Sequence, residues 1–336
     1  MAKRRTMSKR SKIEPAVLTF TLATPGTTAG THYVDLSQIA SLVNRRFYRQ
    51  GINWAVAGFK FSSTRAGKVN VYKLPNTWVM SNAWEKAFRA WQRMNNEALA
   101  EAESVRPRFL DFKVYADAAH HSAGFGANLL PYDSAGNQAN TGEWESSKVV
   151  IPKTDGTDNA TNRELIATGP SFPGNSVTTG FDAVSLIEGY ASSRGLPNVL
   201  DPNAPDDAAS VTGNFPENWM AAMFNTGTDR DEQVIDDMIT ENNLAPYPFE
   251  NDGVNLDTMY PGGANNMPAL EWHDIVQLYS SSGTTQIGIQ HGKGGTFPCG
   301  LIAFNWTPEE AANLVIQIDL MPGNHRGYLC EPMTEM

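Results

Sequence analysis

The sequence has little charge, few cysteines and no long apolar run. Only 18% of its 336 residues are charged, against roughly 25% in typical soluble domains. No run reaches the ~18 apolar residues that suggest a transmembrane helix, so we expect no membrane partner. The two cysteines, Cys299 and Cys330, form neither a CxxC pair nor a disulfide framework. We expect two buried free thiols, with a disulfide as the alternative if their strands are neighbours.

The sequence also lacks the motifs of the common enzyme classes. Neither GxSxG nor HExxH is present. Residues 291–296 (HGKGGT) lack the spacing of a phosphate-binding loop, and we interpret them as a β-hairpin connection. Gly124-Phe125-Gly126 lacks the third glycine of a dinucleotide fingerprint. His120 and His121 would point to opposite faces of a strand, which disfavours a zinc site. We therefore expect no enzymatic activity and no resident cofactor.

Acidic side chains cluster in two places without the spacing of an EF-hand. The clusters comprise Asp201, Asp206, Asp207, Asp229, Asp231, Glu232, Asp236 and Asp237. A solvated acidic face is the preferred interpretation. The alternative is an interfacial divalent cation, such as calcium, that bridges two subunits.

Positive charge is scarce except in the first twelve residues, which contain no acid. The chain has 26 Lys+Arg against 36 Asp+Glu, a net charge of −10. Six of the basic residues lie in this arm, so residues 13–336 keep 20 against 36, a net of −16. We expect the arm to be disordered and to bind nucleic acid, because phosphate binding releases counterions. Its basic residues are Lys3, Arg4, Arg5, Lys9, Arg10 and Lys12.

Other interpretations of the arm remain open. It is also typical of a solvated tail, and short basic clusters serve as nuclear localisation signals. A mitochondrial transit peptide is disfavoured, since Ala2 and Met7 supply no apolar face. We expect no secretory signal, because Glu14 and Pro15 stand where its apolar core would be.

The rest of the chain is dominated by period-2 alternation, which predicts strands. Residues 53–61 and 68–74 are predicted to pair across a turn at 62–67. The other predicted strands are residues 16–22, 32–36, 109–115, 148–151, 184–189, 271–279, 285–290, 300–305 and 314–320.

Helical spacing is clearest over residues 82–103, where Trp84, Phe88 and Trp91 form an apolar stripe that we assign to the core. Residues 37–46 are ambiguous between helix and strand, and 217–224 and 229–242 are short predicted helices. We expect an arm over residues 1–14 and one β domain over 15–336, with insertions at about 82–103 and 120–265. The predicted fold is all-β: a single jelly-roll antiparallel β-sandwich with long loops.

In pattern the chain resembles capsid proteins of the single jelly-roll type, and more narrowly those of circular, Rep-encoding single-stranded DNA viruses known from environmental sequences. The resemblance is carried by residues 2–12, by residues 313–323 (NLVIQIDLMPG) and by Arg326-Gly327-Tyr328. It implies a closed icosahedral shell of many copies that packages single-stranded DNA. It also implies a place in the virion, with the host nucleus as a further site during assembly. One departure is that the arms of that family are often longer and richer in arginine.

The leading hypothesis is therefore a self-assembling capsid protein that holds single-stranded DNA through its arm. The alternative is a secreted carbohydrate-binding or carbohydrate-active β-sandwich, suggested by tryptophans expected to be exposed in loops: Trp144, Trp219 and Trp272. A host nucleic-acid-binding protein is a weaker option, because we identify no basic stripe with interleaved aromatic residues beyond the arm.

Overall fold

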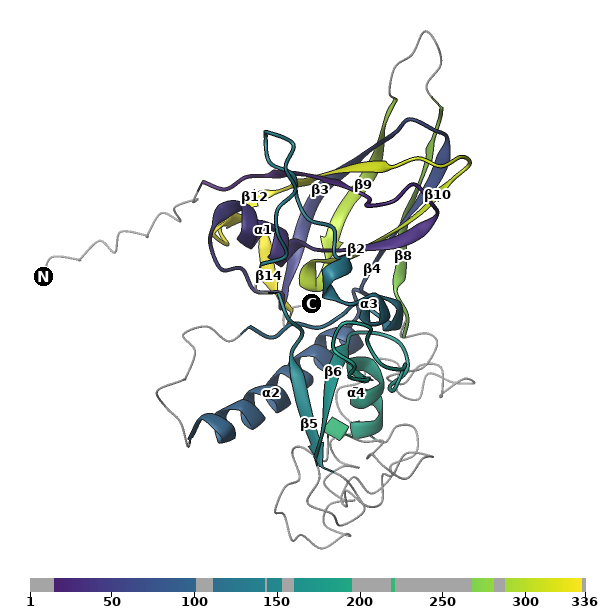
Figure 1. Ribbon diagram of the computed structural model, residues 1–336. Helices are drawn as coiled ribbons and strands as arrows, with labels where there is room; N and C mark the ends of the chain where they lie inside the picture. The colour runs from purple at the N-terminus through teal and green to yellow at the C-terminus, as the bar shows by residue number, and fades with distance from the viewer. Residues whose placement is uncertain are drawn as a thin grey trace, which may run out of the picture.

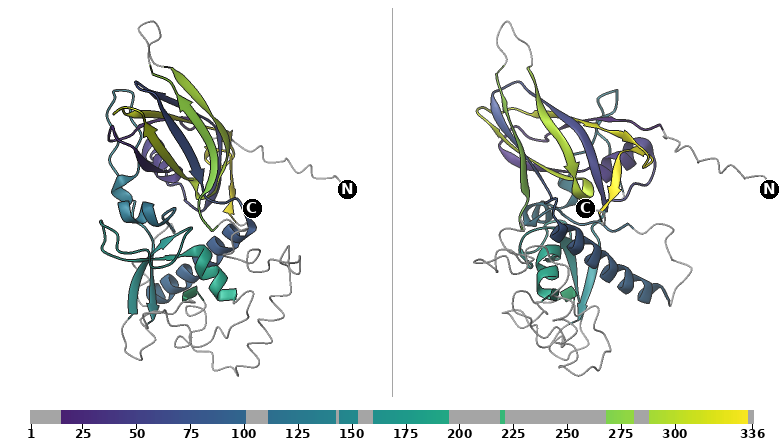
Figure 2. Two further views of the ribbon diagram at one scale, coloured as in Figure 1. Left: turned by 90° about the vertical axis from the view of Figure 1, so that its right-hand side faces the viewer. Right: turned by 180° about the vertical axis from the view of Figure 1, so that it is seen from behind.

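The computed structural model describes residues 15–100, 111–142, 144–152, 160–194, 219–220, 268–280 and 288–333. A β-sandwich forms one part of the molecule, and a mixed α/β insertion lies at one end of it. Figure 1 shows the sandwich above and the insertion below, and both further views in Figure 2 show the same division. The chain from Pro15, the helix α1 (Leu36–Asn44) and the C-terminal strands lie on the sandwich.

The sandwich consists of two antiparallel sheets. In the first, β3 is central and also pairs at its start with the short C-terminal strand β14 (Cys330–Pro332). Its pairing order is β1 (Thr19–Ala23), β11 (Leu314–Leu320), β3 (Ile52–Ser63) and β9 (Ile289–Phe297). The second has the order β2 (Gly30–Asp35), β10 (Leu301–Pro308), β4 (Gly67–Lys73) and β8 (Glu271–Leu278).

This pairing order is that of a jelly roll, so the predicted fold class is confirmed. Counted along the chain, the eight sandwich strands pair as 1-8-3-6 and 2-7-4-5. The predicted pairing of residues 53–61 with 68–74 is wrong, because β3 and β4 lie in opposite sheets. The turn at 64–66 carries the chain across the sandwich, which lets each strand bury one face on the shared core.

The core between the sheets is aliphatic and aromatic. Ile316 and Ile318 of β11 stand opposite Phe61 and Phe59 of β3, and all four side chains are buried. The Phe59 ring contacts the ring of Phe304 from the second sheet, with centroids 5.6 Å apart in an edge-to-face arrangement. The period-2 alternation of the sequence therefore correctly marked the buried face.

The glycine-rich run 291–296 lies inside β9 rather than in a hairpin connection, so that prediction is wrong. A Cβ on Gly294 would lie 2.3 Å from the carbonyl oxygen of Ala57, and one on Gly292 would lie 2.9 Å from the Phe61 ring. These glycines let β9 pack closely against β3, so in this segment they do not indicate a turn. Of the strand predicted at 285–290, residues 289–290 belong to β9 and 285–287 lie outside the described residues.

The insertion connects β4 to β8, and its buried cluster, which includes Trp84, extends to Tyr33, Leu301 and Ala303 of the second sheet. Its long helix α2 (Trp78–Ala100) begins four residues before the predicted start. The other elements are α3 (Ala118–Ala123), β5 (Lys148–Pro152), β6 (Ala160–Ile166), β7 (Ala183–Ser185) and α4 (Leu186–Arg194). Short 3-10 turns occupy Phe125–Ala127 and Pro298–Gly300, and β12 (Pro322–Gly323) pairs with β13 (Gly327–Tyr328).

Several predictions for the insertion need correction. Residues 111–114 are not a strand, and Tyr115 forms only an isolated bridge to Ile166, although Phe112 and Val114 are buried as expected. Strand β6 was not predicted, and of 184–189 only the first two residues are in a strand, because α4 begins at Leu186. The predicted helix at 229–242 lies outside the described residues.

A buried polar network joins the insertion to the sandwich. The His120 ring of α3 is fully buried and stacks on Tyr33 of β2, with ring centroids 4.3 Å apart. Its Nδ1 accepts a hydrogen bond from the Ala116 N–H at 3.1 Å, which leaves Nε2–H to donate to Asn128 Oδ1 at 2.7 Å. Asn128 Nδ2 in turn donates to Gln38 Oε1 of α1. The network requires a neutral imidazole, because Nδ1 is already an acceptor.

We predict that this network makes stability acid-sensitive. Burial lowers the pKa of His120 from 6.5 to about 4. Below pH 6.5 the imidazole of His120 therefore binds a proton in the unfolded chain, whereas in the folded chain it stays neutral until the pH approaches 4. The stabilisation is complete above pH 6.5 and is lost as pH falls toward 4, by about 3 kcal/mol in all. Denaturant unfolding at pH 7, 6, 5 and 4 measures it, and His120→Gln should flatten this dependence. Equal pH dependence in both proteins would contradict the assignment.

Candidate nucleic-acid interface

The described chain begins at Pro15, directly after the predicted arm at residues 1–14, and we call the segment from Pro15 to Val17 the arm root. Three hydrogen bonds hold this root on the sandwich. Arg46 Nη1 donates to the Pro15 carbonyl at 3.1 Å, and the Val17 N–H donates to Asn44 Oδ1 at 3.0 Å. The Tyr328 hydroxyl donates to the Val17 carbonyl at 2.6 Å. The six predicted binding residues, Lys3 to Lys12, lie outside the described residues, but the point from which they extend is defined.

Helix α1 (Leu36–Asn44) places basic residues at this root. Asp35 caps its first turn by accepting from the backbone N–H groups of Ser37 and Gln38. The helix ends at Arg45, which adopts a left-handed conformation with φ 56°. Arg45 and Arg46 therefore stand at the C-terminal end of the helix, where the dipole favours cations. The ambiguity over residues 37–46 is thus resolved as a helix.

Three arginines lie within residues 45–49, and a fourth contacts this segment from the C-terminal part of the chain; we call Arg45, Arg46, Arg49 and Arg326 the arginine cluster. Arg326 reaches it from the C-terminal segment, where its guanidinium donates to the Phe47 carbonyl. Tyr48 adds a second contact between the same two segments, since its hydroxyl donates to the Arg326 carbonyl at 3.0 Å. The cluster thus joins segments almost 280 residues apart in sequence.

The charge of this cluster is only partly neutralised: the Arg49 charge interacts with Asp111, whose pKa burial raises and Arg49 lowers. Arg45 and Arg49 are exposed, and neither they nor Arg326 form an ion pair with any described residue. Burial lowers the pKa of the neighbouring His325, and the charges of Arg326 and Arg49 lower it further. By contrast, Arg65 at the far end of β3 pairs with Glu310 at 2.9 Å. Exposed arginines close together on an acidic protein are typical of a polyanion-binding surface.

One short run beyond the arm does combine basic and aromatic residues, although its Tyr48 side chain is buried. Residues 45–49 read Arg-Arg-Phe-Tyr-Arg, the alternation that single-strand binders use. The contribution of Arg326 carries no local signal, because it depends on the return of the chain after β11.

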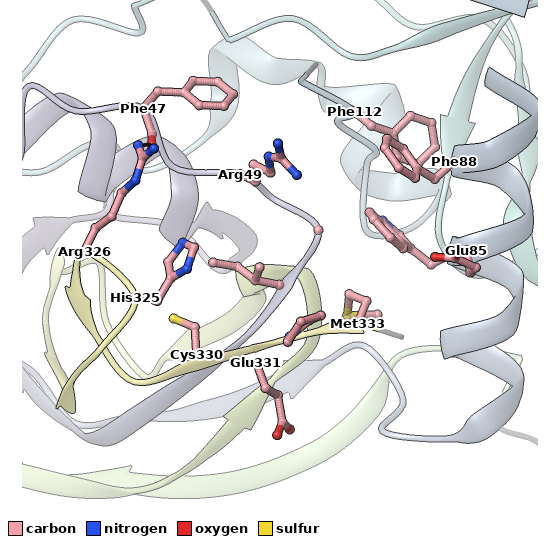
Figure 3. A pocket seen from close by; sticks show the side chains of 14 residues that line it. Phe47, Arg49, Glu85, Phe88, Phe112, His325, Arg326, Cys330, Glu331 and Met333 are labelled. Atoms are coloured by element: carbon pink, nitrogen blue, oxygen red, sulfur yellow. Dashed lines mark hydrogen bonds between the residues drawn. The ribbon is translucent and has the colours of Figure 1, made fainter. Parts of the chain in front are cut away.

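A pocket of about 480 Å³ opens beside the cluster. The segment 47–52 forms one wall, the start of α2 a second, and β14 with residues 325–326 a third. Figure 3 shows Arg326 and His325 on one side and Phe88 and Phe112 on the other, with Arg49 between them. Gly51 lies flat against Trp84, where a Cβ would come within 2.0 Å of the ring. This glycine brings the segment and α2 close enough to enclose the pocket.

The other candidates from the sequence do not form a site. His120 and His121 lie on helix α3, not on a strand, and both are buried. His121 Nε2 lies 2.9 Å from Glu164 Oε2. Burial by itself would raise the pKa of Glu164, but contacts with His121, Ser146 and Thr179 leave it lowered. Among the described residues, no group of three or more His, Cys, Asp or Glu could hold a metal.

Of the remaining sequence predictions, some are confirmed, some are corrected and some lie outside the described residues. Cys299 and Cys330 are free, as expected, although Cys330 is only partly buried. Trp144 and Trp219 are buried, which corrects the expectation that they are exposed, while Trp272 is 55% exposed. The eight acidic residues at 201–237 lie outside the described residues. No helix in the described ranges is long and apolar enough to cross a membrane.

We predict that Tyr328→Phe loosens the arm root. The Tyr328 hydroxyl also accepts from Asn44 Nδ2 at 2.7 Å, so its loss leaves two polar partners unsatisfied. We expect the free energy of unfolding to fall by about 1–3 kcal/mol, as measured in denaturant. Tyr279→Phe is the matched control, because this hydroxyl belongs to a side chain that is 67% exposed. An equal loss in both variants would contradict the role of Tyr328.

In comparisons with known proteins, no family model, no curated protein and no solved structure matches the chain.

Proposed function

We propose that the protein is a viral capsid subunit that self-assembles into an icosahedral shell and packages single-stranded DNA. The observation that carries the proposal is that two features occur together in this protein. One is a jelly roll with the pairing order 1-8-3-6 and 2-7-4-5. The other is a basic arm that leaves this jelly roll beside the arginine cluster. A jelly-roll wedge tiles through its edges, and the arm supplies the polyanion contact.

The charge distribution supports the proposal. Residues 13–336 carry a net charge of −16, while the arm carries six positive charges. The four residues of the arginine cluster lie at the arm root and extend that basic surface onto the folded body. Six arm charges alone neutralise little genome. With the four arginines of the cluster, the arm and its root together have ten basic residues. The acidic remainder suits an outer face.

An apolar edge supports self-association. Strand β8 is the last strand of its sheet, so one of its backbone edges has no ladder partner among the described strands. Trp272, Ile275 and Tyr279 project from it or from its end with exposed fractions of 55%, 45% and 67%. Protein edges of this kind pair with other chains unless they are charged or covered. A second copy of the chain is the natural occupant in a shell.

The carbohydrate alternative has lost most of its basis. Of the three tryptophans that suggested it, only Trp272 is exposed. A single tryptophan on a sheet edge serves a protein contact as well as a sugar contact, and the assembly experiments separate the two.

We predict that the full chain forms uniform shells that retain nucleic acid, while a variant lacking residues 1–12 retains little or none. Negative-stain microscopy and the ratio of absorbance at 260 and 280 nm measure both properties. Retention should fall steeply with salt, because it depends on counterion release. A variant with the six arm residues changed to Gln controls for arm length. Dispersed monomers under all salt conditions and with added DNA would contradict the capsid proposal.

We also predict that Trp272→Ser weakens assembly at least tenfold in the protein concentration required, since an exposed aromatic anchor often contributes more than about 1.4 kcal/mol to an interface. The monomer should stay folded, because the side chain is half-exposed. Light scattering against protein concentration measures the effect. Val177→Ser is the control, as an apolar residue with 78% exposure on a loop of the insertion. Unchanged assembly of the Trp272 variant would remove this edge from the interface.

A further inference from the structure

The β-sandwich has two incomplete sides, which lie at opposite ends of its sheets. Strand β1 is at one end of the first sheet, and β9 is at the other end. Strand β9 contacts β8, the last strand of the second sheet. The exposed apolar side chains of β8 and the outer edge of β1 therefore lie on opposite sides of the sandwich. They cannot meet within one chain, but they can meet between two neighbouring copies.

The exposed side chains of β8 form an apolar stripe because a β-bulge changes the alternation of the strand. The ladder with β4 shifts register between Trp272 and Asp274, so β8 has one extra residue there. The bulge brings Trp272 and Ile275, three positions apart, to the same face, and Tyr279 lies just beyond the end of the strand. All three side chains are exposed. At about 3.3 Å per residue, this β8 stripe is roughly 23 Å long.

A groove of about 840 Å³ runs along β1 on the other side. The strand itself lines it from Val17 to Ala23, and Val315 of β11 and Val43 of α1 add apolar surface. Residues from 131 to 136 form the opposing wall. Val17 and Val315 are exposed. The lining part of β1 is roughly 20 Å long at the same rise per residue, which is close to the length of the β8 stripe.

Backbone groups along this groove lack partners. The Leu18 carbonyl and the Thr24 N–H bond to β11, so residues 19, 21 and 23 turn their backbone groups to the outer edge. Among the described residues, only the Thr21 carbonyl has a partner there, the Tyr132 N–H at 2.8 Å. The groove therefore offers unpaired backbone donors and acceptors together with apolar side chains, as strand edges that pair with another chain do.

The groove and the β8 stripe are complementary in shape and charge. Asp133 lines the groove, and hydrogen bonds from the backbone N–H groups of Asn137 and Ala135 lower its pKa, so it stays ionised. Lys293 lies beside β8, where its N–H donates to Asp274 and its side chain is 81% exposed. Two β8 stripes in mutual contact would instead oppose protruding side chains, with no hollow to receive them.

We propose that the groove along β1 receives the β8 stripe of a neighbouring copy, whose apolar side chains then cover Val17 and Val315. The inference rests on the proposed shell function and adds to it the surface with which β8 associates. The contact is heterologous, because the two copies contribute different surfaces. Contacts of this kind propagate from copy to copy and can close into rings, whereas a contact between two identical surfaces ends at a dimer.

Cross-linking between two single-cysteine variants of the full chain tests this contact. Both carry Cys330→Ser, which leaves Cys299 as the native thiol, and Cys299 is fully buried. One variant adds Thr21→Cys in the groove, and the other adds Ile275→Cys on the stripe. After co-assembly, a short bismaleimide should join the two variants into covalent dimers. Each variant assembled alone should give none, because its neighbour presents the other surface.

A matched control and a second measurement locate the contact. Val177→Cys, on an exposed loop of the insertion, should give no dimers with Thr21→Cys. Thr21→Arg fills the groove, so it should raise the protein concentration required for assembly at least tenfold. Adding Trp272→Ser to the same chain should raise it much less than the product of the two single effects, because both changes remove one contact. Circular dichroism verifies that each variant is folded.

The outcomes separate this inference from the capsid proposal. Shells in which the groove and stripe variants give no joint dimers would overturn the inference and leave the capsid proposal intact. Equal dimer yields from Ile275→Cys alone would overturn it as well, since two β8 stripes would then be in contact. Independent, multiplicative effects of Thr21→Arg and Trp272→Ser would also contradict it. If the unmodified chain forms no assembly under any condition, both proposals are overturned.

Discussion

The buried carboxylate of Asp35 is the interaction on which the rest of the structure depends. It lies at the end of β2 and is fully buried, with no described cation paired to it. Five neutral donors satisfy it: the Ser37 N–H and hydroxyl, the Gln38 N–H, Gln50 Nε2 and Trp144 Nε1. A buried charge persists only where such hydrogen bonds replace water. These donors come from α1, from the chain before β3 and from the insertion, so one carboxylate fixes three parts of the molecule.

This arrangement links the sandwich to the candidate interface. Asp35 fixes the start of α1, and the helix then runs to Asn44, directly before Arg45 and Arg46. Gln50 exchanges two hydrogen bonds with the Val114 backbone, which holds the segment after the arginines against the insertion. The pocket wall at Phe47–Ile52 is therefore positioned by the same network. Function in this protein, as we propose it, sits where the jelly roll, the insertion and the C-terminal segment meet.

Local patterns predicted the sandwich well. Alternation in residues 314–320 matched β11 in both bounds and buried face, and β8 was correct to within one residue. Failures occurred where distant contacts decide. Residues 111 to 114 alternate like a strand, yet no strand in the described part of the chain forms a ladder of backbone hydrogen bonds with them. The glycines of β9 resemble a turn, but they serve close packing against Phe61 and the Ala57 carbonyl. In the sequence, β3 and β4 resemble the two strands of a hairpin. They lie in opposite sheets, because each buries one face in the core between the sheets.

The sequence by itself determined the fold class, the burial pattern of most sandwich strands and the separation of a basic arm from an acidic body. These follow from composition and from a period that each strand carries within itself. Only the tertiary structure decided which strands pair, and that Arg326 and Arg49 line the same pocket. The physical reason is that charge and alternation are local properties, whereas the cluster depends on a hydrogen bond from Arg326 to Phe47 across 279 positions. Such a contact exists only once β11 has returned the chain to the start of the sandwich.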